Sequence, residues 1–172
     1  MKQRICWLFL GVLAIALLGC TNMDLSDSPD SGNTTIEDLE KTEYFQEGAL
    51  EHILEGELNR QGQAVGFHYE GFSSSKGEVI ADTRTEEDKF GVYEAEVMID
   101  DVEKQSNQGR SSFFPEEWSS QEVVLAINEA YENRKGLTGN TYAGLTEDGM
   151  VIQMYLNDDE QIISAFPEYE GE

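Results

Sequence analysis

The sequence predicts an α+β domain that follows an N-terminal export signal. Two stretches have the apolar spacing of amphipathic helices, and several others have the alternation or clustering of apolar residues that is typical of β-strands. The helical patterns occur early and in the middle of the chain, and turn residues separate the strand patterns, which indicates antiparallel pairing. We therefore expect helices packed on an antiparallel sheet.

Residues 1–19 have the features of a bacterial export signal. Lys2 and Arg4 form a short basic region, and residues 7–18 form an apolar stretch that is shorter than the roughly 20 residues of a membrane-spanning helix. The stretch ends in Leu17-Leu18-Gly19-Cys20, which resembles a lipobox. We expect cleavage before Cys20, lipidation of that cysteine, and a lipoprotein anchored at the extracytoplasmic face of the cell membrane. The alternative is a plain secretory signal with an incidental cysteine.

The remaining chain divides by composition into a linker and a domain. Residues 20–42 are acidic and rich in small polar residues, so they bury too little apolar surface to order themselves and form a linker. Residues 43–172 have the usual size of one domain with its own core. Cys6 lies in the signal, so no cysteine pair remains for a disulfide after cleavage. Packing of the core must therefore stabilise this domain.

The first half of the domain contains a helix pattern and two strand patterns. The helix is predicted at residues 46–55 and stops at Gly56. Its apolar residues recur at helical spacing: Ala49, Leu50, Ile53 and Leu54. Residues 77–81 form a weak strand pattern. Residues 93–99 alternate apolar and acidic side chains, which predicts a half-buried strand, and Asp100-Asp101 provides the turn after it.

The second half contains the strongest helix pattern. It begins at Ser119, which forms a capping-box pair with Glu122. Its apolar stripe consists of Val123, Ile127, Ala130 and Tyr131. Gly136 follows two basic residues and is expected to end the helix. Residues 150–156 and 161–166 then read as two strands joined by an Asn-Asp-Asp turn, which predicts a hairpin.

The two histidines of the chain are the candidate acid and base. His52 and His68 lie 16 residues apart, and Lys104 follows further along. Imidazole has an ordinary pKa near ~6.5, so one histidine can act as a base while the other acts as an acid. The sequence has no glycine-rich phosphate loop, no cysteine pair and no His-Glu-x-x-His motif. It therefore predicts no metal site and no cofactor.

Several short segments between residues 43 and 169 together match one family. They are His52-Ile-Leu-Glu-Gly-Glu, Ala64-Val-Gly-Phe-His68, Gly91-Val-Tyr-Glu-Ala-Glu-Val97, Lys104, Ser111-Ser-Phe-Phe-Pro115, Trp118, Ala126-Ile-Asn-Glu-Ala-Tyr131, Gly144-Leu-Thr146, Val151-Ile-Gln-Met-Tyr155 and Ile163-Ser-Ala-Phe-Pro167. In this order they resemble the bacterial EndoU ribonucleases, which occur as toxin domains. The resemblance implies a compact EndoU/barnase-like RNase fold and endonucleolytic cleavage of RNA, commonly at uridine.

The resemblance also implies a role for each candidate residue. Cleavage of RNA can use the ribose 2′-hydroxyl as an internal nucleophile and leaves a 2′,3′-cyclic phosphate. The reaction needs a base for the 2′-hydroxyl, an acid for the departing 5′-oxygen and a cation for the phosphorane. On the family pattern, His68 is the base, His52 is the acid and Lys104 stabilises the charge.

Four further positions are expected to bind the substrate. Ser164 and Phe166 match a Ser/Thr-x-aromatic element that contacts the nucleotide, where many family members have tyrosine in place of the phenylalanine. An aromatic ring there can stack on sugar or base for about 1–3 kcal/mol. Gly66 lets the backbone approach the phosphate closely. Ser112 lies near Lys104 and the substrate, or else simply ends a strand.

The net charge opposes the binding of RNA. The chain has 35 acidic and 11 basic residues, a net charge of −24, and such a body repels a polyanion over a Debye length of about 10 Å at ordinary salt. Removal of the signal with Lys2 and Arg4 leaves 9 basic residues, and 6 of these lie in residues 60–110. This segment also has 11 acidic residues, so its net charge is 6 − 11 = −5. The segment with the predicted base and lysine is therefore the least acidic.

Two hypotheses account for this charge. At 1 M salt the screening length falls to about 3 Å, so an exported nuclease adapted to saline surroundings could approach RNA. The alternative is a catalytically inactive EndoU-like surface lipoprotein that binds a cationic partner. A toxin delivered to competing cells is a third reading, which fits less well because only a lipid site and a spacer precede the domain. The sequence identifies no immunity or inhibitor protein.

Overall fold

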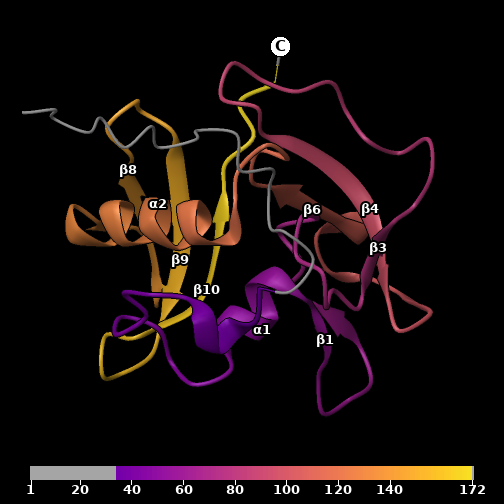
Figure 1. Ribbon diagram of the computed structural model, residues 1–172, viewed down its shortest axis with the longest axis horizontal. Coiled ribbons are helices and arrows are strands. Elements are labelled where there is room, and N and C mark those ends of the chain that lie inside the picture. The colour runs from indigo at the N-terminus through magenta and orange to yellow at the C-terminus, as the bar shows by residue number, and fades with distance from the viewer. Residues whose placement is uncertain (1–33, 172) are drawn as a thin grey trace, which may run out of the picture.

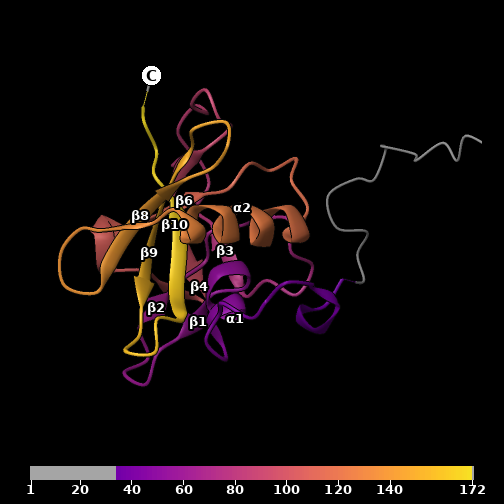
Figure 2. The same ribbon diagram turned by 90° about the vertical axis from the view of Figure 1, so that its left-hand side faces the viewer.

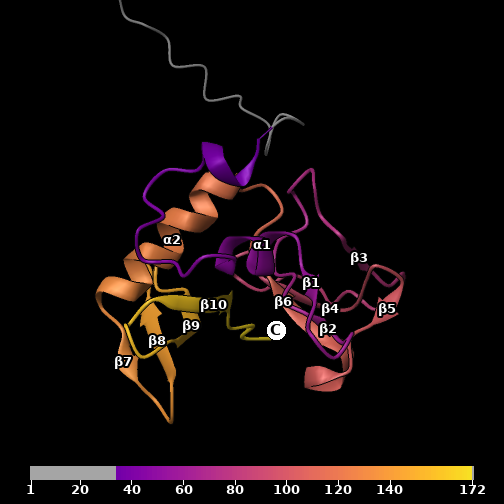
Figure 3. The same ribbon diagram turned by 90° about the horizontal axis from the view of Figure 1, so that it is seen from below.

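Two β-sheet halves form the part of the chain that the structure, a computed structural model, describes: residues 34–171. Helix α1 (Ala49–Leu54) lies between the two halves, as Figure 3 shows from below. The predicted signal, Cys20 and the first part of the predicted linker lie outside the described residues. Within residues 34–171, no helix has the length and apolar character needed to span a bilayer.

The C-terminal half is a four-stranded antiparallel sheet covered by one helix. Its strands are β7 (Lys135–Gly136), β8 (Thr141–Leu145), β9 (Val151–Leu156) and β10 (Ile162–Pro167), in the order β10-β9-β8-β7. Helix α2 (Ser120–Glu132) crosses one face of this sheet (Figures 1 and 2). A side chain at Gly144 would place its Cβ 1.9 Å from the carbonyl oxygen of Ala130, so glycine permits this close packing.

The N-terminal half is built around the long strand β4 (Tyr93–Ile99). The end of β4 pairs with its antiparallel neighbours, β3 (Gly77–Val79) and β5 (Val102–Glu103), whereas its beginning pairs with β6 (Arg110–Phe113). A separate two-stranded ribbon consists of β1 (Glu57–Leu58) and β2 (Ala64–Val65). Short 3-10 helices, η1 (Ile36–Asp38) and η2 (Ser106–Gly109), complete the elements.

The two halves have separate apolar cores. The larger one joins α1, α2 and the four-stranded sheet, and it includes Ile53, Val123, Ile127, Ile152 and Met154, all 0% exposed. The smaller one lies beneath β4 and β6 and includes Phe67, Tyr93, Val97 and Phe113. Each large apolar side chain buried in this way stabilises the fold by about 1.5–3 kcal/mol. Leu39 is also in the larger core, so packed structure begins ahead of residue 43.

The predicted α+β class with antiparallel sheets is confirmed, and most predicted elements are present. Strand β4 and its Asp100-Asp101 turn lie where the alternation placed them, and both aspartates have positive φ. Ser119 caps α2 and forms the capping box with Glu122. The hairpin of β9 and β10 is also present.

Two predicted helix boundaries were wrong. Helix α1 starts at Ala49 and not at residue 46, because Gly48 adopts a left-handed conformation at φ 85°. Helix α2 ends at Glu132 and does not continue to Gly136. Asn133 ends it: its side-chain amide donates to the carbonyl oxygens of Glu129 and Leu145 and accepts from the Leu145 amide. These bonds direct the chain into the sheet, where Gly136 belongs to β7.

Candidate active site

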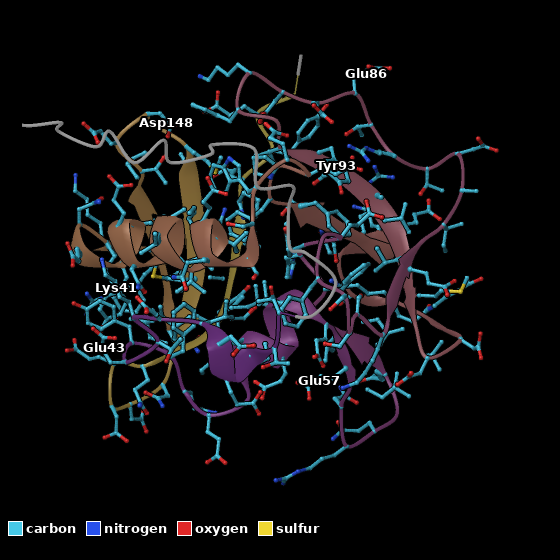
Figure 4. All side chains as sticks on the ribbon, in the orientation of Figure 1. Lys41, Glu43, Glu57, Glu86, Tyr93 and Asp148 are labelled. Carbon is cyan, nitrogen blue, oxygen red and sulfur yellow. The ribbon has the colours of Figure 1, made fainter. Side chains whose placement is uncertain are left out.

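His52 lies in the last turn of α1 and is oriented by a carboxylate. Its Nδ1 is 3.0 Å from Oε1 of Glu57, and its side chain is 18% exposed. Glu57, at the start of β1, is labelled in the lower half of Figure 4. Because Nδ1 bonds to the carboxylate, Nδ1 carries a proton in either charge state. Nε2 has no partner within residues 34–171, so it is available for proton transfer.

His68 is buried deeper and is oriented by a backbone carbonyl. Its Nδ1 donates to the carbonyl oxygen of Ser112 at 2.8 Å, which leaves Nε2 unprotonated in the neutral ring. The ring of Phe166 stacks beside the imidazole, with 5.2 Å between centroids. No described residue bonds to Nε2 of His68. This nitrogen is therefore an acceptor, as a general base requires.

The backbone fixes the two histidines relative to each other. The amide of Phe67 donates to the His52 carbonyl oxygen at 3.0 Å, and the amide of His68 donates to the Ile53 carbonyl oxygen at 2.8 Å. Gly66 makes this approach possible, because it has φ +76° and a Cβ there would lie 2.0 Å from the His52 oxygen. The glycine is thus required by the packing of the two histidine segments, besides lining the cleft.

Lys104 follows β5 and extends toward both histidines. It is 7% exposed, and its Nζ donates to the Gly66 carbonyl oxygen at 3.1 Å and to Oγ of Ser111 at 2.7 Å. No described carboxylate pairs with it. Burial lowers the pKa of Lys104 from its ordinary value of 10.5 to about 8, because desolvation disfavours the charged ammonium.

The electrostatics of the site lower the pKa of both imidazoles, and lower that of His68 further. Burial, then the positive charge of Lys104, holds the pKa of His68 well below its ordinary 6.5. Burial also lowers the pKa of His52, although the hydrogen bond and the charge of Glu57 oppose that effect. His52 is thus the one histidine that a carboxylate helps to protonate. This difference favours His52 as the acid and His68 as the base.

These side chains line one cleft of about 870 Å³ between the two halves of the fold. The predicted residues that line it are His52, Gly66, His68, Lys104, Ser112, Ser164 and Phe166. Positions 52, 66 and 68 come from α1 and the segment after β2, and positions 104 and 112 from the β4 half. Ser164 and Phe166 come from β10. The cleft therefore brings together every candidate substrate-contacting residue from distant parts of the chain.

Three residues of the site were not predicted as site residues, although each lies in a segment that matches the family. Glu57 contacts His52, Ser111 contacts Lys104, and Tyr155, which is 39% exposed, lies 6.1 Å from the Phe166 ring between centroids. A glutamate five residues after a histidine and a serine beside Ser112 are weak signals by themselves. Only the fold shows which of them reach the site. Within residues 34–171, no group of three or more His, Cys, Asp or Glu side chains is arranged to hold a metal ion.

Comparisons with known proteins identify the family of the chain. A protein named "Toxin" from Bacillus cereus is 43% identical over 137 residues, which cover 80% of this chain and 25% of that protein. The chain thus spans about a quarter of the length of this relative. No solved structure gives a significant match. The family model described as "Bacterial EndoU nuclease" matches residues 46–169, most of the chain, and the protein therefore belongs to the bacterial EndoU nuclease family.

Proposed function

We propose that this protein is an endoribonuclease that cleaves RNA through its own 2′-hydroxyl. The observation that carries the proposal is the cleft in which two imidazoles present unoccupied Nε2 atoms beside one ammonium group. These are the three groups that internal transesterification requires: a base, an acid and a cation. Uridine is the expected base at the cut, and Ser164 and Phe166 are the residues that select it.

The proposed reaction assigns one step to each group. Nε2 of His68 removes the proton from the 2′-hydroxyl, and the 2′-oxygen attacks the phosphorus. Lys104 stabilises the negative charge that accumulates on the phosphorane oxygens. Nε2 of His52 then gives its proton to the 5′-oxygen as the bond to that oxygen breaks. The products are a 2′,3′-cyclic phosphate and a free 5′-hydroxyl.

The pH dependence follows from the two lowered imidazole pKa values. The reaction needs neutral His68 together with protonated His52, and both groups titrate below their ordinary 6.5. Activity should therefore be highest at mildly acidic pH and should decline as His52 loses its proton. The negative charge of a bound phosphate raises both pKa values and so moves the active range to higher pH.

The negative surface charge repels RNA, so we propose that the protein acts at high salt concentration. Carboxylates are spread across the whole view in Figure 4, for example Glu43, Glu57, Glu86 and Asp148. The proposal is that the protein is exported, is anchored through Cys20 and acts on extracellular RNA in saline surroundings. Screening then shortens the repulsion between the carboxylates and RNA. RNA cleavage should hold or rise between low and near-molar salt, and a steep fall would exclude this adaptation.

A labelled RNA and the matching DNA test the proposal. Wild-type protein should cut only the RNA, whereas His68→Ala and Lys104→Ala should lose the activity. Lys76→Ala is a matched lysine control, because Lys76 pairs with Glu55 and is 47% exposed. Equal cutting of DNA would exclude the internal nucleophile. Absence of RNA cleavage together with capture of a basic partner would favour the alternative, an inactive domain that binds a cationic protein.

A further inference from the structure

Ser111 is a buried hydroxyl whose bonds are both directed at the site. It lies on β6, is 1% exposed, and pairs with Ala95 of β4 in the sheet. Its Oγ accepts from Nζ of Lys104 at 2.7 Å and donates to the carbonyl oxygen of Gly66 at 3.2 Å. The serine thus connects the ammonium group of Lys104 to the backbone beside His68.

The ammonium group of Lys104 has three N–H donors, and two of them are engaged. One bonds to the Gly66 oxygen and one to Oγ of Ser111. Among residues 34–171, no acceptor takes the third donor. Two fixed bonds define the direction of the third N–H of a tetrahedral ammonium. A single bond would leave the group free to rotate at the end of its four-carbon side chain.

We propose that Ser111 is a positioning residue that directs the free N–H of Lys104 at the phosphate of the substrate. This inference rests on the proposed function, because it assigns Lys104 to the phosphorane. Ser111 does not act as a nucleophile in this arrangement, since its own proton is donated to the Gly66 oxygen. Its contribution is the fixed acceptor that holds the ammonium in one orientation.

Ser111 also favours the charged form of Lys104. Oγ is an acceptor for the ammonium, and no described carboxylate supplies that support. The other titratable groups that line the cleft with Lys104 are His52, His68, Glu94, Arg110, Tyr155, Glu168 and Tyr169, and Glu96 and Glu103 line the small pocket along its side chain. Removal of Oγ should therefore lower the pKa of Lys104 further below about 8.

The test compares three variants of the full-length protein on labelled RNA. Ser111→Ala should lower kcat about tenfold or more and leave KM nearly unchanged, because the lost interaction acts in the transition state. Ser111→Thr retains the hydroxyl and should recover most of the activity. Ser119→Ala is the stability control, since it removes the cap of α2 at a cost of about 1 kcal/mol without touching the cleft. It should retain the wild-type kcat.

A second measurement does not depend on RNA cleavage. NMR titration of the Lys104 side chain should give a lower pKa in Ser111→Ala than in the wild type, and an unchanged pKa in Ser119→Ala. If wild-type protein fails to cut RNA, the proposed function is wrong, whereas this titration still tests the contact. If the wild type cuts RNA, and Ser111→Ala has the same kcat and the same Lys104 pKa as the wild type, the positioning role is wrong.

Discussion

The burial of Lys104 has a measurable cost to stability. A lysine with an ordinary pKa of 10.5 and a folded pKa of about 8 binds its proton more weakly in the folded state. At ~1.4 kcal/mol per pH unit, this difference amounts to about 3 kcal/mol of destabilisation at neutral pH. Replacement of the lysine by methionine, which has a similar shape and no charge, removes this cost.

The net gain is smaller than that figure. Lys104→Met leaves Oγ of Ser111 without its ammonium donor, at a cost of about 1 kcal/mol. The Gly66 oxygen keeps a partner, because Ser111 still donates to it. We therefore expect Lys104→Met to be more stable than the wild type by about 1–2 kcal/mol at pH 7, a rise in Tm of about 4–8 °C. Its RNA cleavage should be lost.

Denaturant unfolding of both proteins between pH 7 and 10.5 checks the cause. Below pH 8, the folded and unfolded wild type both hold the lysine proton, so the cost is complete. Between about 8 and 10.5 the unfolded state holds more protons, and wild-type stability gains relative to the variant as the pH rises. Other titrating groups are shared and cancel in the comparison.

Two results would refute this reasoning. One is a variant less stable than the wild type at pH 7, which would mean that the bonds to Ser111 and Gly66 outweigh the desolvation of the ammonium. The other is a stability difference that stays constant between pH 7 and 10.5. In that case the gain would come from packing and not from a buried charge.

Three further predictions concern the histidines. Gly66→Ala should destabilise the protein by more than about 2 kcal/mol, because an alanine is strained at φ +76° and its Cβ would collide with the His52 oxygen; wild-type stability in denaturant unfolding would disprove this. Glu57→Gln should lower the pKa of His52 further and move the pH optimum of RNA cleavage to lower pH; an unchanged profile would show that Glu57 does not support the acid. The pKa of His68 is lower in the folded than in the unfolded protein, so the wild type should lose stability as the pH falls through 6.5. The free energy of unfolding should therefore fall less between pH 7 and pH 5 in His68→Asn than in the wild type, and an equal fall would contradict this.

The sequence predicted those helices and strands that are determined by the spacing of their own residues. The alternation in β4 and the capping box of α2 depend on local spacing, and both lie where expected. Strands β6 and β8 have no such pattern. The serines of β6 form a strand because they pair with β4. Position 144 of β8 is a glycine because α2 packs too closely there for a side chain. Tertiary pairing determines these strands.

In the candidate site, the sequence predicted the main residues but not their hydrogen-bond partners. The family motifs selected His52, His68 and Lys104, which the fold brings to one cleft. The partners of these residues could not be predicted, because they depend on which atoms meet after folding. The serine in contact with Lys104 is Ser111, whereas Ser112 supplies its carbonyl oxygen to His68. Neighbours on a strand point to opposite faces, and the sequence alone does not show which face meets the site.

One substrate tests the central claim most directly: an RNA oligonucleotide with a single 2′-deoxyribose at the nucleotide where the wild-type protein cuts. We expect cleavage of the all-ribose strand, with a mass that identifies a 2′,3′-cyclic phosphate at the new end. The strand with the single deoxyribose should stay intact at that position. Cleavage there at the wild-type rate, or a product with a 5′-phosphate, would show that His68 does not activate a ribose hydroxyl.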